Sequence, residues 1–125
     1  MIKYREAEKK DWESIRAIIS LYPKVLMQWH LPKWNRFFIA EDNKNIVGCC
    51  ALDIYSKRIA EIRSLAVLLD YQRGGIRTRL IELCLKKAKK KGVFEIITIT
   101  GKVNLFNKFG FNTFNNEKIA LIKVL

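Results

Sequence analysis

Apolar and polar residues alternate in several stretches of this chain, which is the pattern of β-strands with one buried face. Residues 2–7 (IKYREA) alternate in their first half and predict a short first strand. The runs 37–41 and 46–55 are strand-like and are joined by the polar sequence DNKN, so they predict a β-hairpin. The run 59–70 is rich in β-branched and aliphatic residues and predicts a long central strand.

Two other stretches repeat their apolar residues with the period of an α-helix. The first helix is predicted after Asp11, an expected N-cap, and ends at Pro23. The second is predicted over 75–91 and ends at Gly92. The residues expected on the buried faces are Ile15, Ile18, Ile19 and Tyr22 in the first helix, and Ile76, Leu80, Leu83, Cys84 and Ala88 in the second.

The segments between these elements are shorter and less regular. Residues 24–36 mix aromatic, basic and proline residues without a clear period, and they predict a short helix or a loop broken near Pro32 that can serve as a lid. The run 93–100 (VFEIITIT) predicts a buried strand. The run 103–110 predicts a short helix that ends at a glycine.

The C-terminal part carries two further strand-like runs, at 111–114 and 119–125. We interpret the last run, IALIKVL, as completing the sheet rather than pairing across a dimer, although monomer and homodimer both stay open. The order of elements predicts an α/β (α+β) fold with a mixed central sheet flanked by helices. Because no linker, repeat or low-complexity segment divides the 125 residues, we expect a single domain over 1–125.

Composition argues against several classes of protein. Half of the residues are hydrophobic, but no apolar run approaches the roughly 20 residues of a membrane span. The first residues do not resemble a signal peptide, so we expect a cytoplasmic location and no membrane partner. We interpret the three cysteines, Cys49, Cys50 and Cys84, as buried free thiols. With only one histidine, His30, the sequence predicts no metal site.

The formal net charge of +12 favours binding to polyanions, whether nucleic acid, an anionic surface or a phosphate-rich cofactor. Many of the lysines lie in KKAKKK, residues 86–91. We interpret this run as the solvated face and favourably charged end of a helix, and a dedicated polyanion patch is the alternative. Nucleic acid is therefore a partner that the charge permits but that the sequence does not favour.

The stretch DYQRGGIRTRL, residues 70–80, places two glycines and three arginines between a predicted strand and a predicted helix. The first backbone N–H groups of a helix lack partners and bind phosphate readily, and glycine allows an anion to approach closely. Arginines do not suit the positive end of a helix, so they indicate a bound anion. The stretch lacks the glycine patterns of P-loop and Rossmann nucleotide sites.

The segment 60–92 resembles the acyl-CoA-binding core of the GNAT superfamily of N-acetyltransferases. The family signature Q/R-x-x-G-x-G/A follows an L-A-V strand, and Gln72, Gly75 and position 77 correspond to it. The run 105–111 (LFNKFGF) is similar to the family's last helix and its closing Gly-Phe. Within the family, the region 60–111 most resembles N-acetylglutamate-synthase-like domains, whereas the N-terminal part matches only in pattern.

The resemblance implies that acetyl-CoA is the cofactor. In this family the strand before the motif bulges and separates from its neighbour, its backbone pairs with the pantetheine arm, and the motif amides hold the pyrophosphate. The residues implied in cofactor binding are Leu65, Ala66 and Val67 in the strand, Gln72, Arg73, Gly74, Gly75, Ile76, Arg77 and Thr78 in the motif, and Asn104 and Phe106 in the last helix. For Asn104, a helix-capping role is an equally good interpretation.

The resemblance also implies the catalytic groups. Glu61 stands where several family members carry a glutamate that acts as a base, directly or through water, and the backbone N–H of Val67 is the implied oxyanion donor. On a regular strand, Glu61, Arg63, Leu65 and Val67 share one face. The structural alternative for Glu61 is an ion pair with a nearby arginine or lysine.

The acceptor is implied to be a primary amine of a small molecule, an amino acid or a peptide. Trp29, His30 and Arg63 are the expected substrate-binding residues, although side chains such as Trp29 and His30 more often cover a core than line a pocket. Arg63 suits an acidic acceptor such as glutamate or aspartate.

Two residues depart from the family pattern. Arg77 replaces the final Gly or Ala of the signature, and Phe106 replaces a tyrosine that often acts as the acid. These departures and the charge support a second hypothesis, a catalytically weak or inactive module of the same fold that binds CoA, RNA or a protein partner through its basic surface.

Overall fold

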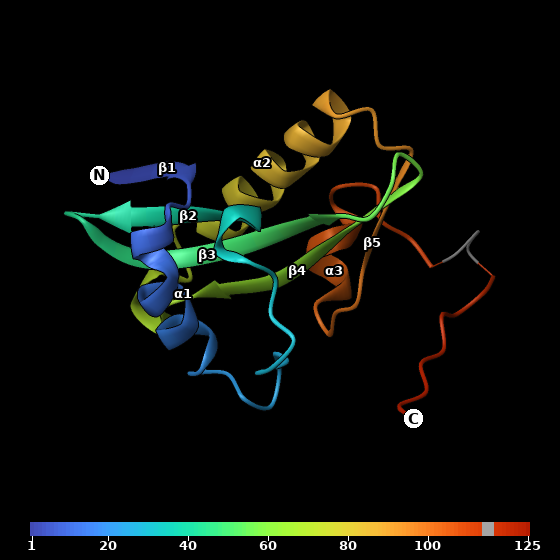
Figure 1. Cartoon of the computed structure of the whole chain (residues 1–125), viewed down its shortest axis with the longest axis horizontal. Helices are drawn as coiled ribbons and strands as arrows, with labels where there is room; N and C mark the ends of the chain where they lie inside the picture. Colours follow the sequence, from blue (N-terminus) through green and yellow to red (C-terminus); the bar gives the residue numbers. More distant parts are fainter. Residues whose placement is uncertain (114–116) are drawn as a thin grey trace.

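Among the residues that the structure describes, the sheet contains five strands, which lie side by side in the order in which they occur along the chain (Figure 1). The first four strands pair antiparallel, and the fifth pairs parallel to the fourth, so the predicted mixed sheet is confirmed. The computed structural model describes residues 1–113 and 117–125. The strands are β1 (Ile2–Glu6), β2 (Phe37–Asp42), β3 (Asn45–Ile54), β4 (Ile59–Val67) and β5 (Glu95–Thr98).

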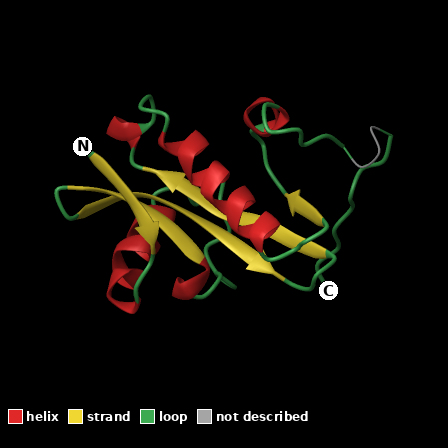
Figure 2. Ribbon diagram, turned by 90° about the horizontal axis from the view of Figure 1, so that it is seen from above, coloured by secondary structure: helices red, strands yellow, loops and turns green. Residues whose placement is uncertain are grey.

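Two helices cover opposite faces of this sheet (Figure 2). Helix α1 (Trp12–Ile19) packs on one face, and α2 (Ile76–Lys90) packs on the other, where the short helix α3 (Val103–Asn107) also lies. We call the two buried clusters the α1 core and the α2 core. The α1 core contains Ala7, Ile15, Ile18, Ile19, Phe37, Ile39, Cys49, Ala51 and Ala66. The α2 core contains Phe38, Ala40, Val47, Cys50, Leu52, Ala60, Ile62, Val67, Ile76, Leu80, Ile81, Cys84, Ala88 and Phe106.

The predicted hairpin between β2 and β3 is confirmed. Its turn residues Asn43 and Lys44 have φ angles of 48° and 69°. Two consecutive positive φ angles are typical of the tight turns whose twist matches that of paired strands.

Several predicted bounds are wrong because local turns end the elements early. Helix α1 ends at Ile19 rather than at Pro23, and the predicted strand 59–70 ends at Val67 and is followed by a 3₁₀ turn at Leu69–Tyr71. The segment 24–36 contains one 3₁₀ turn, Trp34–Arg36, and no longer helix. Strand β5 and helix α3 are also shorter than the predicted runs 93–100 and 103–110.

The prediction that 119–125 completes the sheet is wrong. These residues form no strand, and their apolar side chains are exposed as the segment runs away from the sheet (Figure 1). An apolar pattern supplies strand propensity, but a strand also needs a neighbour to receive its backbone hydrogen bonds. Residues 111–113 are not strand either, and position 114 of the predicted run 111–114 lies outside the described residues.

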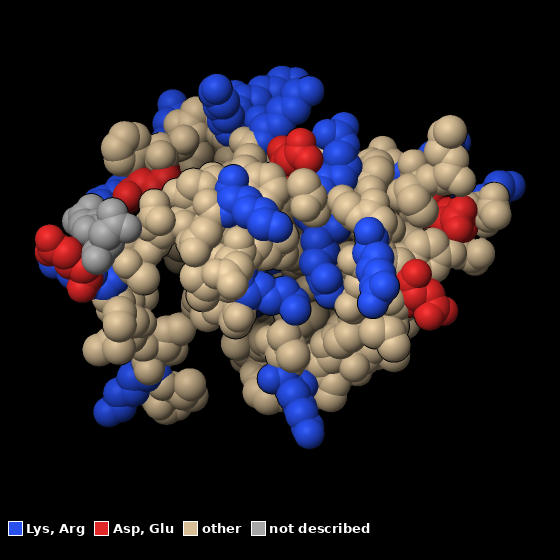
Figure 3. Space-filling model, turned by 180° about the vertical axis from the view of Figure 1, so that it is seen from behind, with Lys and Arg blue, Asp and Glu red and all other residues tan. Residues whose placement is uncertain are grey.

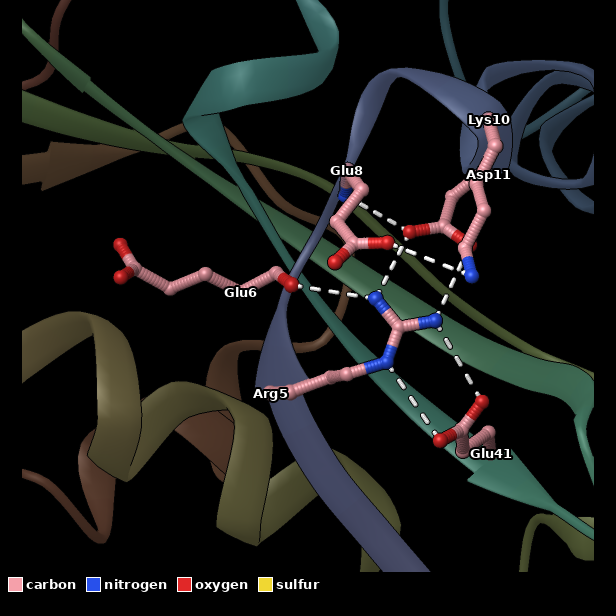
Figure 4. Close-up of polar contacts among 6 residues, drawn as sticks. All are labelled: Arg5, Glu6, Glu8, Lys10, Asp11 and Glu41. Atoms are coloured by element: carbon pink, nitrogen blue, oxygen red, sulfur yellow. Dashed lines mark hydrogen bonds and ion pairs between the residues drawn. The ribbon is translucent and has the colours of Figure 1, made fainter.

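A cluster of charged groups fixes the start of α1 to the sheet (Figure 4). The Arg5 guanidinium donates to both oxygens of Asp11, at 2.8 and 3.0 Å, and to both oxygens of Glu41, each at 3.4 Å. We call these three residues the Arg5 clamp. Asp11 is buried and also accepts the backbone N–H of Glu8 at 2.7 Å.

The predicted role of Asp11 as a helix cap therefore needs correction. Asp11 stands at the N-cap position of α1, but its carboxylate binds none of the N–H groups of that helix. The hydrogen bonds from Arg5 hold the pKa of the Asp11 carboxyl below its usual value, although burial opposes this shift.

Candidate active site

Strands β4 and β5 pair over only part of their length. The parallel pairing runs from Ile59 opposite Glu95 to Ile62 opposite Thr98. At its end, the Thr98 hydroxyl donates to the carbonyl oxygen of Ile62 at 3.1 Å. Residues 63–67 of β4 continue beyond this point without β5 beside them. The edge of β4 that faces away from β3 is therefore without a neighbouring strand over residues 63–67.

Strand β4 contains a bulge at the start of this open section. Cys49 of β3 lies opposite Ala66, but Ala51, two residues further along β3, lies opposite Arg63, three residues back along β4. Ser64 lies within the bulge and has a φ of 56°, in the left-handed region that non-glycine residues rarely adopt. The bulge that the resemblance implied is therefore present.

The bulge reverses which residues face each side of the sheet. Before the bulge, Ala60 and Ile62 belong to the α2 core, so Glu61 and Arg63 point to the side of α1. After it, Val67 belongs to the α2 core and Ala66 to the α1 core. The prediction that Glu61, Arg63, Leu65 and Val67 share one face is therefore wrong, because the extra residue shifts the alternation by one position.

The backbone of Val67 is directed toward the open edge. The N–H of the next residue, Leu68, donates to Val47 on β3 at 2.9 Å. In an antiparallel pair, adjacent residues direct their polar groups to opposite sides, so the N–H and C=O of Val67 point away from β3. The Val67 carbonyl accepts the Tyr22 hydroxyl at 2.5 Å and the Gln72 side-chain amide at 3.1 Å.

The turn before α2 depends on its second glycine. Gly75 is the N-cap of α2 and has a φ of 79°, whereas Gly74 has no positive φ and has room for a side chain. The first N–H groups of α2, at residues 76–78, have no carbonyl partner within the helix. A third glycine, Gly48, lets this end of α2 approach the sheet, because a Cβ there would lie 3.1 Å from a methyl group of Ile76.

The arginines near this turn differ in their surroundings. Within residues 1–113 and 117–125, neither Arg73 nor Arg77 forms an ion pair with a carboxylate. Arg79 lies over the Tyr4 ring, with its guanidinium carbon 5.8 Å from the ring centre. The face opposite to that of Figure 1 carries many lysine and arginine side chains and few acidic ones (Figure 3).

A hollow of about 410 Å³ lies between the start of α2 and the start of α3. Its lining brings together Arg77 and Asn104, two predicted cofactor residues from separate segments, and adds Lys102. Asn104 is the second residue of α3 and not its N-cap, which is Lys102. Phe106 is buried in the α2 core and meets Phe111 edge-to-face at 5.3 Å.

A polar group of residues lies on the α1 side of the sheet, before the bulge. The Tyr55 hydroxyl donates to Glu61 at 2.6 Å. Partial burial and the Glu61 carboxylate raise the pKa of Tyr55 to about 12, so this hydroxyl keeps its proton at neutral pH. Glu61 forms no ion pair within the described part of the chain, which disfavours the structural alternative considered for it.

Arg63 connects this polar group to the segment 24–36. Its guanidinium donates to Asp53 at 3.1 Å and to the backbone carbonyl of His30 at 2.9 Å. Trp29 is 68% exposed, so it does not cover the core, and His30 is exposed with a φ of 56°. The three expected acceptor residues thus lie on one side of the sheet, with the charge of Arg63 balanced by Asp53.

Known proteins match this arrangement. The model of the acetyltransferase (GNAT) family matches residues 2–111. This chain belongs to the GNAT acetyltransferase family. A curated relative, an uncharacterized N-acetyltransferase of Chlorobaculum tepidum, is 35% identical over 81 residues, which cover 65% of this chain and 52% of the relative. The match thus spans about half the length of that relative.

Solved structures agree with GNAT membership. The protein Rv2747 of Mycobacterium tuberculosis, solved in complex with CoA, gives a TM-score of 0.81 at 23% identity over 90% of this chain and 72% of its own. N-acetylglutamate synthase of Neisseria gonorrhoeae, complexed with coenzyme A and L-arginine, gives 0.77 at 27% identity over 96% of this chain and 29% of its own. The predicted GNAT fold and the resemblance to N-acetylglutamate-synthase-like domains are confirmed.

Sequence reasoning on the GNAT site missed four residues. Asp53 and Tyr55 belong to a predicted strand, but their place beside Glu61 and Arg63 depends on the register of β3 and β4, which the sequence does not give. Tyr22 was assigned to the buried face of a helix that in fact ends earlier. Lys102 carried no signal, since an isolated lysine before a short helix is common on surfaces.

The three cysteines are free and buried, as predicted. Burial raises the pKa of Cys49 to about 12. Across the described ranges, we find no group of three or more side chains suited to hold a metal ion. In the same ranges, every helix is too short or too polar to span a membrane.

Proposed function

We propose that this chain transfers an acetyl group from acetyl-CoA to a primary amine of a small molecule, an amino acid or a peptide, and that residues 1–125 act as a single N-acetyltransferase domain. The observation that carries this proposal is the open edge of β4 beyond Ile62, toward which the N–H of Val67 points. A strand edge of this kind receives an extended ligand through backbone hydrogen bonds.

The residues around the open edge fit coenzyme A. The pantetheine arm pairs with the backbone of residues 65–67, in the position that a continued β5 would occupy. The phosphates lie against the backbone amides of residues 72–78 at the start of α2. Arg73 and Arg77, which have no carboxylate partner in the described ranges, supply charge for these phosphates. Asn104 reaches the same ligand from the other side of the hollow.

Bound acetyl-CoA supplies a thioester carbon that an amine can attack and a thiolate that leaves readily. Glu61 accepts the proton of the attacking amine, directly or through water, and the N–H of Val67 donates to the thioester oxygen as it becomes negative. The C–N bond forms, the C–S bond breaks, and water protonates the thiolate. Since Phe106 is buried and has no proton to donate, the last helix supplies no acid at that position.

The acceptor binds on the α1 side of the sheet, because Glu61 faces that side while the cofactor contacts lie after the bulge. Trp29, His30 and Arg63 line its approach. Arg63 already balances Asp53, so an acidic acceptor does not find a free positive charge there. This feature favours selection of the acceptor by shape and hydrogen bonding over selection by a carboxylate group.

The first experiment is calorimetric titration of acetyl-CoA into the wild-type protein and two variants of Gly75. Gly75→Glu places a negative charge at the phosphate position and strains a φ of 79°, so we expect binding to be lost. Gly75→Asn tolerates that φ without a charge and serves as the matched control, with affinity within about tenfold of wild type. Equal binding by all three proteins, or none by the wild type, contradicts the proposal.

The base is tested by release of CoA thiol in the presence of a panel of primary amines. We expect Glu61→Gln to lower kcat by roughly 10²- to 10⁴-fold and to leave acetyl-CoA affinity unchanged, because it removes only the proton acceptor. Arg58→Gln changes a charged residue near the same end of β4 and serves as the control, since Arg58 pairs with Glu95 at the surface. A Glu61→Gln enzyme with wild-type kcat excludes Glu61 as the base.

A second candidate function is an inactive module that binds RNA or an acidic partner through its basic face. The net charge of +12 and the distribution of lysine and arginine in Figure 3 favour it. Binding to RNA then weakens steeply with salt and does not require acetyl-CoA. If titration with single-stranded RNA gives such binding and the wild type binds no acetyl-CoA, the second function replaces the first.

A further inference from the structure

Positively charged side chains surround an exposed phenylalanine at the end of α2. Phe94 is 82% exposed and follows the turn that ends this helix. The lysines at the helix end precede it, and the loop between β3 and β4 adds two more cations. Lysine and arginine side chains gather at the upper edge of Figure 3, where Figure 1 places the end of α2. We call six exposed residues the Phe94 patch: Lys57, Arg58, Lys89, Lys90, Lys91 and Phe94.

Backbone hydrogen bonds bring the two parts of the Phe94 patch together. After α2 the chain turns at Gly92, which has a φ of 74° and whose N–H donates to the carbonyl of Lys89 at 3.1 Å. The N–H of Phe94 then donates to the carbonyl of Lys57, and that of the next residue donates to the carbonyl of Arg58, each at 2.9 Å. Cations from two separate segments therefore lie on the backbone next to Phe94.

Most of the charge of the Phe94 patch is unbalanced. Arg58 forms an ion pair with Glu95 at 3.2 Å. Over residues 1–113 and 117–125, none of the lysines of the patch forms an ion pair with a carboxylate. The helix dipole favours cations in the last turn of α2, but it does not account for Lys57, which lies in a different segment. The patch therefore offers charge to a polyanion.

The exposed ring of Phe94 indicates which polyanion fits. Bases of a single strand stack on exposed aromatic rings while the phosphates of its backbone contact the surrounding cations. In a duplex the bases stack on one another, so their faces are not free to contact the ring. An anionic membrane is bound through a broad apolar face, whereas the Phe94 patch contains a single apolar side chain. The patch thus fits a single-stranded nucleic acid better than a duplex or a lipid surface.

We propose that the Phe94 patch binds single-stranded nucleic acid, with phosphates against its lysines and one base stacked on the Phe94 ring. The site lies apart from the start of α2, because this helix contains 15 residues and its two ends are thus about 22 Å apart. The inference is independent of the proposed function. It differs from the second candidate function because one protein molecule can transfer acetyl groups and hold the strand at the same time.

The test is fluorescence anisotropy with labelled oligo-uridine and oligo-deoxythymidine of about 15 nucleotides. The variants are Lys89→Glu/Lys90→Glu, which reverses two charges of the patch, and Phe94→Leu, which keeps an apolar side chain but removes the ring. Lys9→Glu/Lys10→Glu is the matched control, because it makes the same change in net charge at exposed lysines before α1. A thermal melt shows whether each variant is folded.

We expect Lys89→Glu/Lys90→Glu to lower the affinity roughly tenfold or more and to reduce the slope of log K against log salt by about 1.4, since each phosphate contact of a single strand contributes about 0.7. Phe94→Leu lowers the affinity roughly tenfold at an unchanged slope, because it removes a stacked base and no charge. The control stays within about threefold of the wild type. Inorganic polyphosphate, which has no bases, binds equally to the wild type and to Phe94→Leu.

The two labelled strands and acetyl-CoA identify the ligand and its place. Binding of either strand supports the site, and a preference for one of them distinguishes RNA from DNA as its source. Displacement of the strands by saturating acetyl-CoA overturns the proposal, because it places them at the start of α2. Strand binding by a wild type that binds no acetyl-CoA supports this site and contradicts the proposed function.

The variants and a lipid probe supply the remaining outcomes. Equal losses in Lys89→Glu/Lys90→Glu and in the control overturn the proposal, since they report net charge alone. Wild-type affinity of Phe94→Leu overturns it in favour of a general polyanion surface. Absence of strand binding by the wild type overturns it as well, and binding to phosphatidylglycerol vesicles in that case assigns the patch to an anionic membrane.

Discussion

The two main helices begin in opposite electrostatic surroundings. At the start of α1, Arg5 meets the carboxylates of Asp11 and Glu41, and the first turn contains an acidic residue, as the helix dipole favours (Figure 4). At the start of α2, the first turn contains no acidic residue, and Arg73 and Arg77 lack a carboxylate partner in the described ranges. Charge that the protein balances internally supports its fold, whereas charge that it leaves unbalanced is available to a ligand.

The strongest test of this comparison is Arg5→Met, which leaves the buried Asp11 carboxylate without its partner. We expect the free energy of unfolding to fall by about 2–4 kcal/mol, since removal of one member of a buried pair leaves an uncompensated charge. Urea denaturation measures this loss. Arg58→Met is the control, because the Arg58 side chain is 75% exposed and its ion pair contributes less than about 1 kcal/mol. Equal losses in the two variants contradict the assignment of the Arg5 clamp to stability.

Arg77→Ala tests the other helix start. We expect the affinity for acetyl-CoA to fall roughly tenfold, about 1.4 kcal/mol, with the free energy of unfolding unchanged within about 0.5 kcal/mol. Calorimetry and urea denaturation measure the two quantities. Arg79→Ala, which removes an arginine held over Tyr4, is the control and keeps wild-type affinity. Tighter binding by Arg77→Ala shows that the arginine obstructs the cofactor, and then the unbalanced charge has another purpose.

Low pH is expected to weaken the Arg5 clamp, and this effect on stability is smaller than that of the two substitutions above. The lowered pKa of Asp11 means that its contribution to stability is present above the ordinary aspartate pKa of about 3.9 and is lost as pH falls through the folded value. We therefore expect the difference in Tm between the wild type and Arg5→Met to narrow below about pH 4. A difference that stays constant from pH 7 to pH 3 contradicts the ionic character of the clamp. Thermal melts at a series of pH values measure it.

The smallest expected effect is that of salt concentration on acetyl-CoA affinity and on the stability that the Arg5 clamp contributes. Between about 50 and 500 mM salt we expect acetyl-CoA affinity to fall by a few fold, because the arginines at the start of α2 are accessible to ions. The cost of Arg5→Met stays nearly constant over this range, since a buried pair is screened less. Arg77→Ala has a weaker salt dependence than the wild type if Arg77 contacts a phosphate, and an unchanged dependence argues against that contact.

The strands, the hairpin, the long helix α2 and the family motif were all predictable, because each is encoded by neighbouring residues. The change of face at the Ser64 bulge was not predictable, since the alternation rule assumes an uninterrupted strand. The position of the bulge had no sign in the sequence either, because serine does not favour a positive φ. The hydrogen bond from Tyr22 to the Val67 carbonyl could not be predicted, because the two residues are 45 positions apart and no local pattern connects them. The strand over 119–125 was wrongly predicted, because an apolar pattern indicates strand propensity but does not supply a neighbouring strand.

The pairing of Asp53 with Arg63 shows the same limit at the candidate site. Each residue type was visible in the sequence, but which charge meets which depends on the register of β3 and β4. The residue types at the candidate site were thus visible in the sequence, whereas their contacts depended on the strand register.

The extra residue in β4 also places the two halves of the strand on different faces of the sheet. Residues 61 and 63 lie on the α1 side of the sheet, and residues 65 and 67 lie on the α2 side, although all four follow one another at intervals of two. Under the proposed function, substitutions at Arg63 change acceptor choice while the use of acetyl-CoA is retained, whereas Glu61 has to stay as the base. If the proposed function holds, a protein engineer can vary position 63 and its neighbours on the α1 side while the residues after the bulge are held constant.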